Sequence, residues 1–182
     1  RSKPQIVSVY PPEGGRNVHL ISEIKVVFDT PLDKGNIDVV GVPGRTVHEG
    51  NTLTFVQNAL FRPGTEYTVS ISATSTDGVD ADEVKYKFRT VDLTDTIWVE
   101  VDLARTNLVR VYKGDTLIKV MLASGGTDAT PTVLGTFYVS DRGKSFFSAR
   151  FGEGALYWVR FYGNYLFHSM PRDPAWNIKE EA

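Results

Sequence analysis

The 182-residue sequence contains no cysteine. This absence excludes disulfides, zinc sites built on thiolates and a thiol nucleophile from within these residues. The sequence also lacks a run of about 18–20 apolar residues, which a membrane-spanning helix requires. No block of lysine and arginine occurs either: 20 basic and 22 acidic residues are spread along the chain, and the net charge is −2. Such a balance gives no electrostatic basis for binding nucleic acid.

The first half of the sequence shows the two-residue periodicity of strands and no amphipathic helix. Apolar residues alternate with polar ones in three segments, namely Ile24, Val26 and Phe28; Tyr67, Val69, Ile71 and Ala73; and Val84, Tyr86 and Phe88. Turn signals separate these segments at residues 11–15, 42–44, 62–64 and 77–78, a spacing typical of a small β-sandwich. Residues 1–92 therefore form one predicted all-β domain.

A second β-rich domain is predicted for residues 95–182, after a short polar segment at residues 90–95. Strand patterns recur at residues 97–103, 109–111 and 118–122, and the last two flank a tight turn at Gly114 and Asp115. Residues 125–131 read as a long loop. Further strands are expected at residues 135–140, 156–162 and 165–168.

Several short motifs of the second domain occur together and in one order. They are the segments 96–103 (TIWVEVDL), 111–114 (VYKG), 123–126 (ASGG), 130–132 (TPT), 135–137 (GTF), 157–161 (YWVRF) and 167–169 (FHS). Together they resemble the YkuD-type (ErfK/YbiS-like) L,D-transpeptidase catalytic domain. The first domain, with PPEGG at 11–15, IKVVFD at 24–29 and PLD at 31–33, is similar to bacterial immunoglobulin-like modules. The expected fold is thus mostly β: an N-terminal immunoglobulin-like β-sandwich, followed by a C-terminally incomplete L,D-transpeptidase domain.

The resemblance implies a catalytic role for His168. In the family, this histidine activates a cysteine of a Ser/Thr-His-Gly-Cys motif further along the chain, and the backbone carbonyl of the next residue, here Ser169, orients the imidazole. We expect the nucleophile to lie beyond residue 182, so that this chain alone is inactive. Tyr157, which precedes His168 on an aromatic strand, is expected to bind substrate by lining the acyl-donor groove or stabilising the oxyanion.

The reaction implied by the family is acyl transfer through a cysteine thioester. The donor is a peptidoglycan stem tetrapeptide, and the acceptor is the side-chain amine of another stem; if water replaces the amine, the enzyme is a carboxypeptidase. The resemblance also implies inhibition by carbapenems and a location in the extracellular cell envelope, with membrane attachment only through an anchor upstream of Arg1. No cofactor or metal is implied. The alternative is a noncatalytic wall-binding or adhesion module on the same scaffold, in a protein that has no cysteine at that place.

Other chemistry-bearing residues receive simpler interpretations. Asp77, Asp80, Asp82 and Glu83 lack the spacing of a calcium loop and favour a solvated hairpin turn. Arg142, Lys144 and Arg150, together with Phe146 and Phe147, have the composition of a lid or of an ordinary polar loop.

Overall fold

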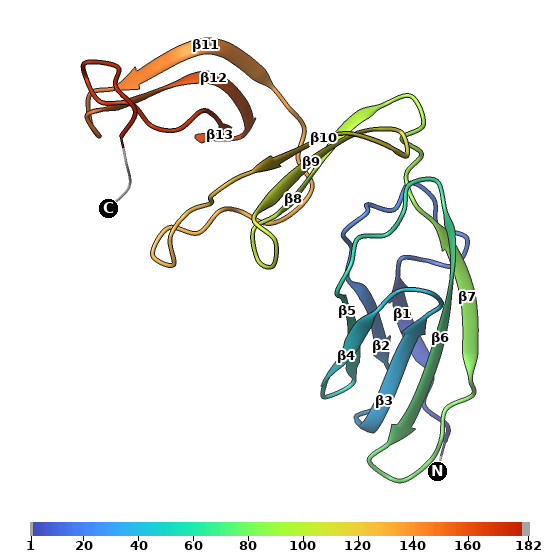
Figure 1. The fold of residues 1–182 in the computed structure, drawn as a ribbon. Coiled ribbons are helices and arrows are strands. Elements are labelled where there is room, and N and C mark those ends of the chain that lie inside the picture. Colours follow the sequence, from blue (N-terminus) through green and yellow to red (C-terminus); the bar gives the residue numbers. More distant parts are fainter. Residues whose placement is uncertain (1, 180–182) are drawn as a thin grey trace. The chain divides into compact units, whose positions relative to one another are not determined.

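The computed structural model describes residues 2–179 as strands and connecting loops (Figure 1). Within this range, no helix is long and apolar enough to cross a membrane. The chain divides into two compact units, Arg1–Gly125 and Gly126–Ala182. This division keeps residues 97–122 with the first unit, whereas the sequence places a domain boundary near residues 93–94. The domain ranges 1–92 and 95–182 remain a prediction, and residues 180–182 lie outside the described residues.

Two antiparallel sheets form the sandwich of the first unit (Figure 1). One sheet has the order β1-β2-β5-β4, with β1 at Ile6–Tyr10, β2 at Ile24–Phe28, β5 at Thr52–Gln57 and β4 at Gly44–Glu49. The other has the order β3-β6-β7, with β3 at Leu32–Val39, β6 at Glu66–Ser75 and β7 at Val84–Arg89. The predicted all-β sandwich is therefore confirmed.

The sandwich core consists of the inward-facing residues of both sheets. Along β6, Tyr67, Val69, Ile71 and Ala73 are all buried, and the residues between them are more exposed. Two aromatic rings pack around Phe61, whose centroid lies 4.9 Å from that of Tyr67 and 5.4 Å from that of Phe88. The period of two predicted from sequence thus selects the core face of this strand.

A separate three-stranded sheet follows the sandwich within the first unit. Its order is β10-β9-β8, with β8 at Ile97–Asp102, β9 at Leu108–Lys113 and β10 at Thr116–Leu122. The tight hairpin predicted at Gly114 and Asp115 joins β9 to β10. On β8 the apolar residues Ile97, Val99 and Val101 are exposed, whereas the side chains between them are half-buried.

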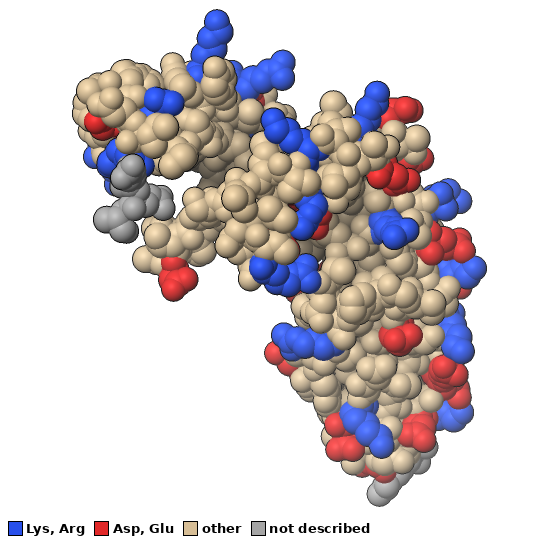
Figure 2. Space-filling model, in the orientation of Figure 1, with Lys and Arg blue, Asp and Glu red and all other residues tan. Residues whose placement is uncertain are grey.

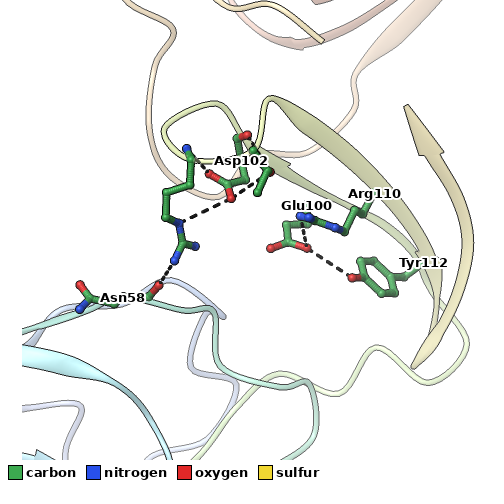
Figure 3. Close-up of polar contacts among 7 residues, drawn as sticks. Asn58, Glu100, Asp102, Arg110 and Tyr112 are labelled. Atoms are coloured by element: carbon green, nitrogen blue, oxygen red, sulfur yellow. Dashed lines mark hydrogen bonds and ion pairs between the residues drawn. The ribbon is translucent and has the colours of Figure 1, made fainter. Parts of the chain in front are cut away.

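Polar contacts organise the β8–β9 hairpin (Figure 3). Tyr112 donates a hydrogen bond to Glu100, which also pairs with Arg110 at 3.5 Å. At the hairpin end, the backbone N–H of Arg105 donates to Asp102, and the Arg105 guanidinium donates to the carbonyl of Asn58 at 2.6 Å. Partial burial would raise the pKa of Asp102, but the hydrogen bonds from Arg105 and Thr106 outweigh it and lower that pKa.

The second unit contains a three-stranded sheet with the order β11-β12-β13. Its strands are β11 at Asp141–Ser148, β12 at Glu153–Tyr162 and β13 at Tyr165–Phe167. The strand predicted at residues 135–140 is wrong. Residues 135–140 form no strand, although the N–H of Ser140 donates to the carbonyl of Arg160 on β12, and Tyr138 and Val139 are exposed. The polar loop or lid expected around Arg142 and Lys144 is also wrong, because both residues lie on β11, which pairs with β12.

Candidate functional site

His168 directly follows β13 and is exposed. Its Nδ1 atom lies 2.7 Å from the backbone carbonyl oxygen of Ser169. A carbonyl oxygen can only accept a hydrogen bond, so Nδ1 carries the hydrogen. In the neutral ring this leaves Nε2 unprotonated and able to accept a proton. The contact is the one that the family resemblance implies for Ser169.

Ser169 is itself fixed to the neighbouring strand by two hydrogen bonds with one residue. Its backbone N–H donates to the carbonyl of Leu156 at 3.0 Å, and its Oγ accepts from the N–H of Leu156 at 2.9 Å. The same hydroxyl donates to the carbonyl of Met170 at 3.0 Å. The serine hydroxyl therefore accepts the hydrogen bond from Leu156 that a backbone carbonyl would accept if β13 continued. We call this pair of contacts the Ser169–Leu156 clasp.

An open hollow of about 500 Å³ lies beside His168 in the second unit. Its lining is mainly apolar and includes Phe146, Phe151, Ala155, Trp158, Leu166 and Pro171. The Phe146 ring meets the imidazole edge to face, with centroids 5.7 Å apart. We call this surface the His168 hollow. Its apolar walls suit the packing of an extended peptide against the sheet.

Charged groups of the His168 hollow are paired within the unit. Arg160 contacts Asp141 at 2.9 Å, and Glu153 pairs with Lys179. Among the described residues, no three His, Cys, Asp or Glu side chains gather in a metal-binding arrangement. Of the titratable side chains that line the hollow, His168 is thus the one without a charged partner among the described residues.

Tyr157 interrupts the alternation of β12. It has a left-handed backbone, with φ at 53°, although it is not glycine, and its side chain is 74% exposed. In a regular strand, Ala155 and Trp158 would face opposite sides of the sheet. Both nevertheless line the His168 hollow, because the backbone at Tyr157 breaks the alternation between them.

The side chain of Tyr157 lines a second, neighbouring hollow of about 320 Å³. We call it the Tyr157 hollow; its walls are Arg142, Gly143, Lys144, Tyr157, Trp158 and Val159. The indole of Trp158 borders both hollows and covers Gly143, where a β-carbon would lie 2.5 Å from the indole nitrogen. The structure thus brings His168 and Ser169 together but places Tyr157 outside the His168 hollow. Its role in substrate binding remains a prediction.

Three residues of this region were not predicted as site residues from the sequence. They are Leu156, whose backbone holds Ser169; Phe146, which packs on the imidazole; and Trp158, which separates the hollows. Pairing of residues 141–148 with 153–160 would have indicated Phe146 and Trp158. The polar sequence Asp-Arg-Gly-Lys-Ser at 141–145 hides that pairing, since a strand signal needs apolar alternation.

Replacing Ser169 by alanine is expected to weaken the orientation of His168. The substitution leaves the N–H of Leu156 without its acceptor and loosens the residue whose carbonyl holds Nδ1. A hydrogen bond worth about 0.5–1.5 kcal/mol corresponds to a fall of roughly two- to tenfold in the ratio of Nδ1–H to Nε2–H tautomer. ¹⁵N NMR of the neutral imidazole measures this ratio.

Ser169→Thr is the matched control, because it keeps the hydroxyl and should keep the tautomer ratio. An unchanged ratio in Ser169→Ala would show that the carbonyl contact holds without the clasp.

Two family models match this chain, one in each half. Residues 1–90 match the bacterial Ig-like domain, and residues 96–180 match the L,D-transpeptidase catalytic domain. Both matches agree with the resemblance stated from the sequence.

Known proteins similar to this chain carry related names. "Putative L,D-transpeptidase YciB" of Bacillus subtilis (strain 168) is 35% identical over 127 residues, which are 66% of this chain and 60% of that protein. This chain therefore matches less than two thirds of the relative's length. Among solved structures, the complex of the L,D-transpeptidase LdtMt1 with imipenem has a TM-score of 0.43 at 18% identity, covering 92% of this chain and 81% of that one. An L,D-transpeptidase from Mycobacterium smegmatis has a TM-score of 0.43 at 16% identity, covering 92% and 80%.

The family assignment rests on the two models and the Bacillus relative. Residues 96–180, which contain His168 and Ser169, belong to the L,D-transpeptidase catalytic domain family, and a bacterial Ig-like domain precedes them.

Proposed function

We propose that this chain carries the base of a peptidoglycan L,D-transpeptidase. The nucleophile is a cysteine supplied from outside these 182 residues, because the chain itself contains none. The observation that carries the proposal is the contact of His168 Nδ1 with the Ser169 carbonyl, which leaves Nε2 free to act as a base. A base beside a thiol is what cysteine acyl transfer requires.

In the proposed reaction, Nε2 takes the proton of the cysteine thiol, and the thiolate attacks an amide carbonyl of a stem tetrapeptide. The tetrahedral intermediate collapses to a thioester as the amide bond breaks, and the imidazolium returns the proton to the leaving D-alanine amine. An acceptor amine then attacks the thioester. The amine passes its proton to Nε2 as the thiolate leaves, and the imidazolium then returns this proton to the thiolate.

The Ser169–Leu156 clasp holds the carbonyl that accepts the Nδ1 hydrogen, so Nε2 is the nitrogen that takes up and returns the proton in both steps. The apolar His168 hollow excludes water from one side of the peptide. Capture of the thioester by water would make the same site a carboxypeptidase. The substrate places the protein in the extracellular cell envelope, where the Ig-like domain acts as a spacer.

Mass spectrometry of the longest natural chain that contains these residues tests the proposal. We expect one thiol that takes one alkyl group, and one adduct of imipenem on the same cysteine. Imipenem is the appropriate probe because it acylates a competent thiolate and needs no acceptor.

The absence of cysteine from these residues also favours a second candidate, a noncatalytic wall-binding module that keeps the scaffold without its nucleophile. A natural chain without a cysteine, or with one that imipenem does not acylate, would favour this candidate over the enzyme.

A further inference from the structure

The backbone of Tyr157 is held in a conformation that its ring does not stabilise by burial. Residues with a β-carbon rarely adopt a left-handed φ, and those that do concentrate at functional sites and ligand clamps. Here φ is 53°, and the side chain is 74% exposed. The exposed ring is therefore available to a ligand at the Tyr157 hollow.

Two cationic side chains, Arg142 and Lys144, line the same hollow. Arg142 and Lys144 make no ion pair or side-chain hydrogen bond with any residue in the described range 2–179, whereas Arg160 on the adjacent strand is bound to Asp141 and to the carbonyl of Gly163. On the face of the second unit drawn in Figure 2, basic groups predominate over acidic ones. The hollow thus presents positive charge that nothing in the described chain neutralises.

Register places these groups close together. Arg142 pairs with Val159 and Gly143 pairs with Trp158, and Lys144 and Tyr157, the next residues along the two strands, line the same hollow. Gly143 lets the indole of Trp158 lie against β11, because a β-carbon there would meet the ring. Two cations, one phenol and the indole thus surround one concave surface, and the indole is also a wall of the His168 hollow.

We propose that the Tyr157 hollow is a subsite for a carboxylate group of the peptide whose scissile bond lies in the His168 hollow. Guanidinium and ammonium groups bind carboxylates through charge-assisted hydrogen bonds, and a phenol hydroxyl adds a donor. The peptide class rests on the proposed function. The charge of the ligand rests on Arg142 and Lys144. An anionic polymer such as nucleic acid fits less well, because two free cations are a small footprint and the whole chain has a net charge of −2.

Binding of two synthetic probes to the 182-residue chain tests the subsite without any turnover. One probe is a stem tetrapeptide with free carboxylates, and the other is the same peptide with every carboxylate amidated. We expect the free-carboxylate peptide to bind about tenfold more tightly at low salt and to lose this advantage as salt screens the charges.

Charge variants locate the effect. Arg142→Gln combined with Lys144→Gln should reduce the affinity for the free-carboxylate peptide to that of the amidated one. Lys119→Gln, on the exposed strand β10, removes a charge elsewhere and should change nothing. Equal binding of the two peptides by the unaltered chain, or a tenfold preference that survives the double substitution, would overturn the proposal.

Substitutions of Tyr157 separate the ring from the backbone. Tyr157→Gly accepts the left-handed φ without strain, so the melting temperature should not fall, whereas the affinity for the free-carboxylate peptide should. A lower melting temperature with unchanged affinity would show that the ring serves the fold and not the ligand.

This experiment and the acylation test fail separately. Charge-dependent peptide binding with no acylated cysteine would retain the subsite and remove the enzyme. An acylated cysteine with no preference between the two peptides would do the reverse.

Discussion

Replacement of His168 by alanine is expected to lower the rate of imipenem acylation by about 10²–10⁴-fold, the range that general-base catalysis contributes. The expectation applies to the natural protein that contains these residues together with its cysteine. A thiol with a pKa of about 8.5 is mostly protonated at neutral pH, and without a neighbouring imidazole only a small fraction is thiolate. Stopped-flow or mass-spectrometric measurement of adduct formation gives the rate.

The effect should decrease as the pH rises. At a pH well above the pKa of the free thiol, the cysteine ionises without help, so the alanine variant should recover most of the rate there. A merely structural role for His168 would give the same loss at every pH.

His48→Ala is the matched control, because His48 lies on β4 of the Ig-like domain and its ring lies 2.9 Å from the carbonyl oxygen of Gly50 in the same domain. Acylation by this variant should proceed at the unaltered rate. If His168→Ala also acylates at that rate, the base is another group and the proposed mechanism is wrong.

The sequence predicts the sandwich well because its signal is local. A strand with one face in the core must alternate, and β6 does so without interruption from Tyr67 to Ala73. The turns at residues 62–64 and 77–78 contain glycines with positive φ, Gly64 and Gly78, so local chemistry and chain reversal agree there.

The second unit is harder to predict because its sheet is less apolar and its geometry is less regular. Residues 141–145 are polar, yet they pair with β12, and pairing is a property of two segments that a single-segment pattern does not contain. Residues 135–140 show the opposite error, because they have strand-like composition but form no strand. Strand propensity describes residues that fit a sheet, and it does not supply the sheet.

The candidate site is likewise only partly predictable from the sequence. His168 and the carbonyl of Ser169 follow from family resemblance, since the two residues are adjacent in sequence. The clasp joins Ser169 to Leu156 across 13 positions, and the shift of Trp158 toward the His168 hollow depends on one backbone angle at Tyr157. Neither feature has a signal in residue type, because serine and tyrosine commonly occupy ordinary strand positions.

Truncation of Phe88 is expected to have the largest effect on stability. Phe88 on β7 is 1% exposed and packs against Phe61 and Tyr67, with centroids 5.4 Å and 5.7 Å away. Phe88→Ala removes these contacts and leaves a cavity between the sheets, which costs about 3–5 kcal/mol in comparable cores. Single domains are stable by about 5–15 kcal/mol, so much of the Ig-like domain's stability would be lost.

Amide hydrogen exchange at Val69 measures this loss for the sandwich alone, which matters because the chain has more than one compact unit. Val69 is fully buried on the central strand β6, between β3 and β7, so its exchange reports global opening of the domain. Val7→Ala on β1 is the control: its side chain is 66% exposed, and its expected cost is under about 0.5 kcal/mol. If Phe88→Ala lowers the opening free energy at Val69 no more than Val7→Ala does, the three-ring cluster does not hold the sheets together. If the opening free energy falls as expected, the binding and acylation experiments on the second domain can use the variant to test whether they need a folded Ig-like domain.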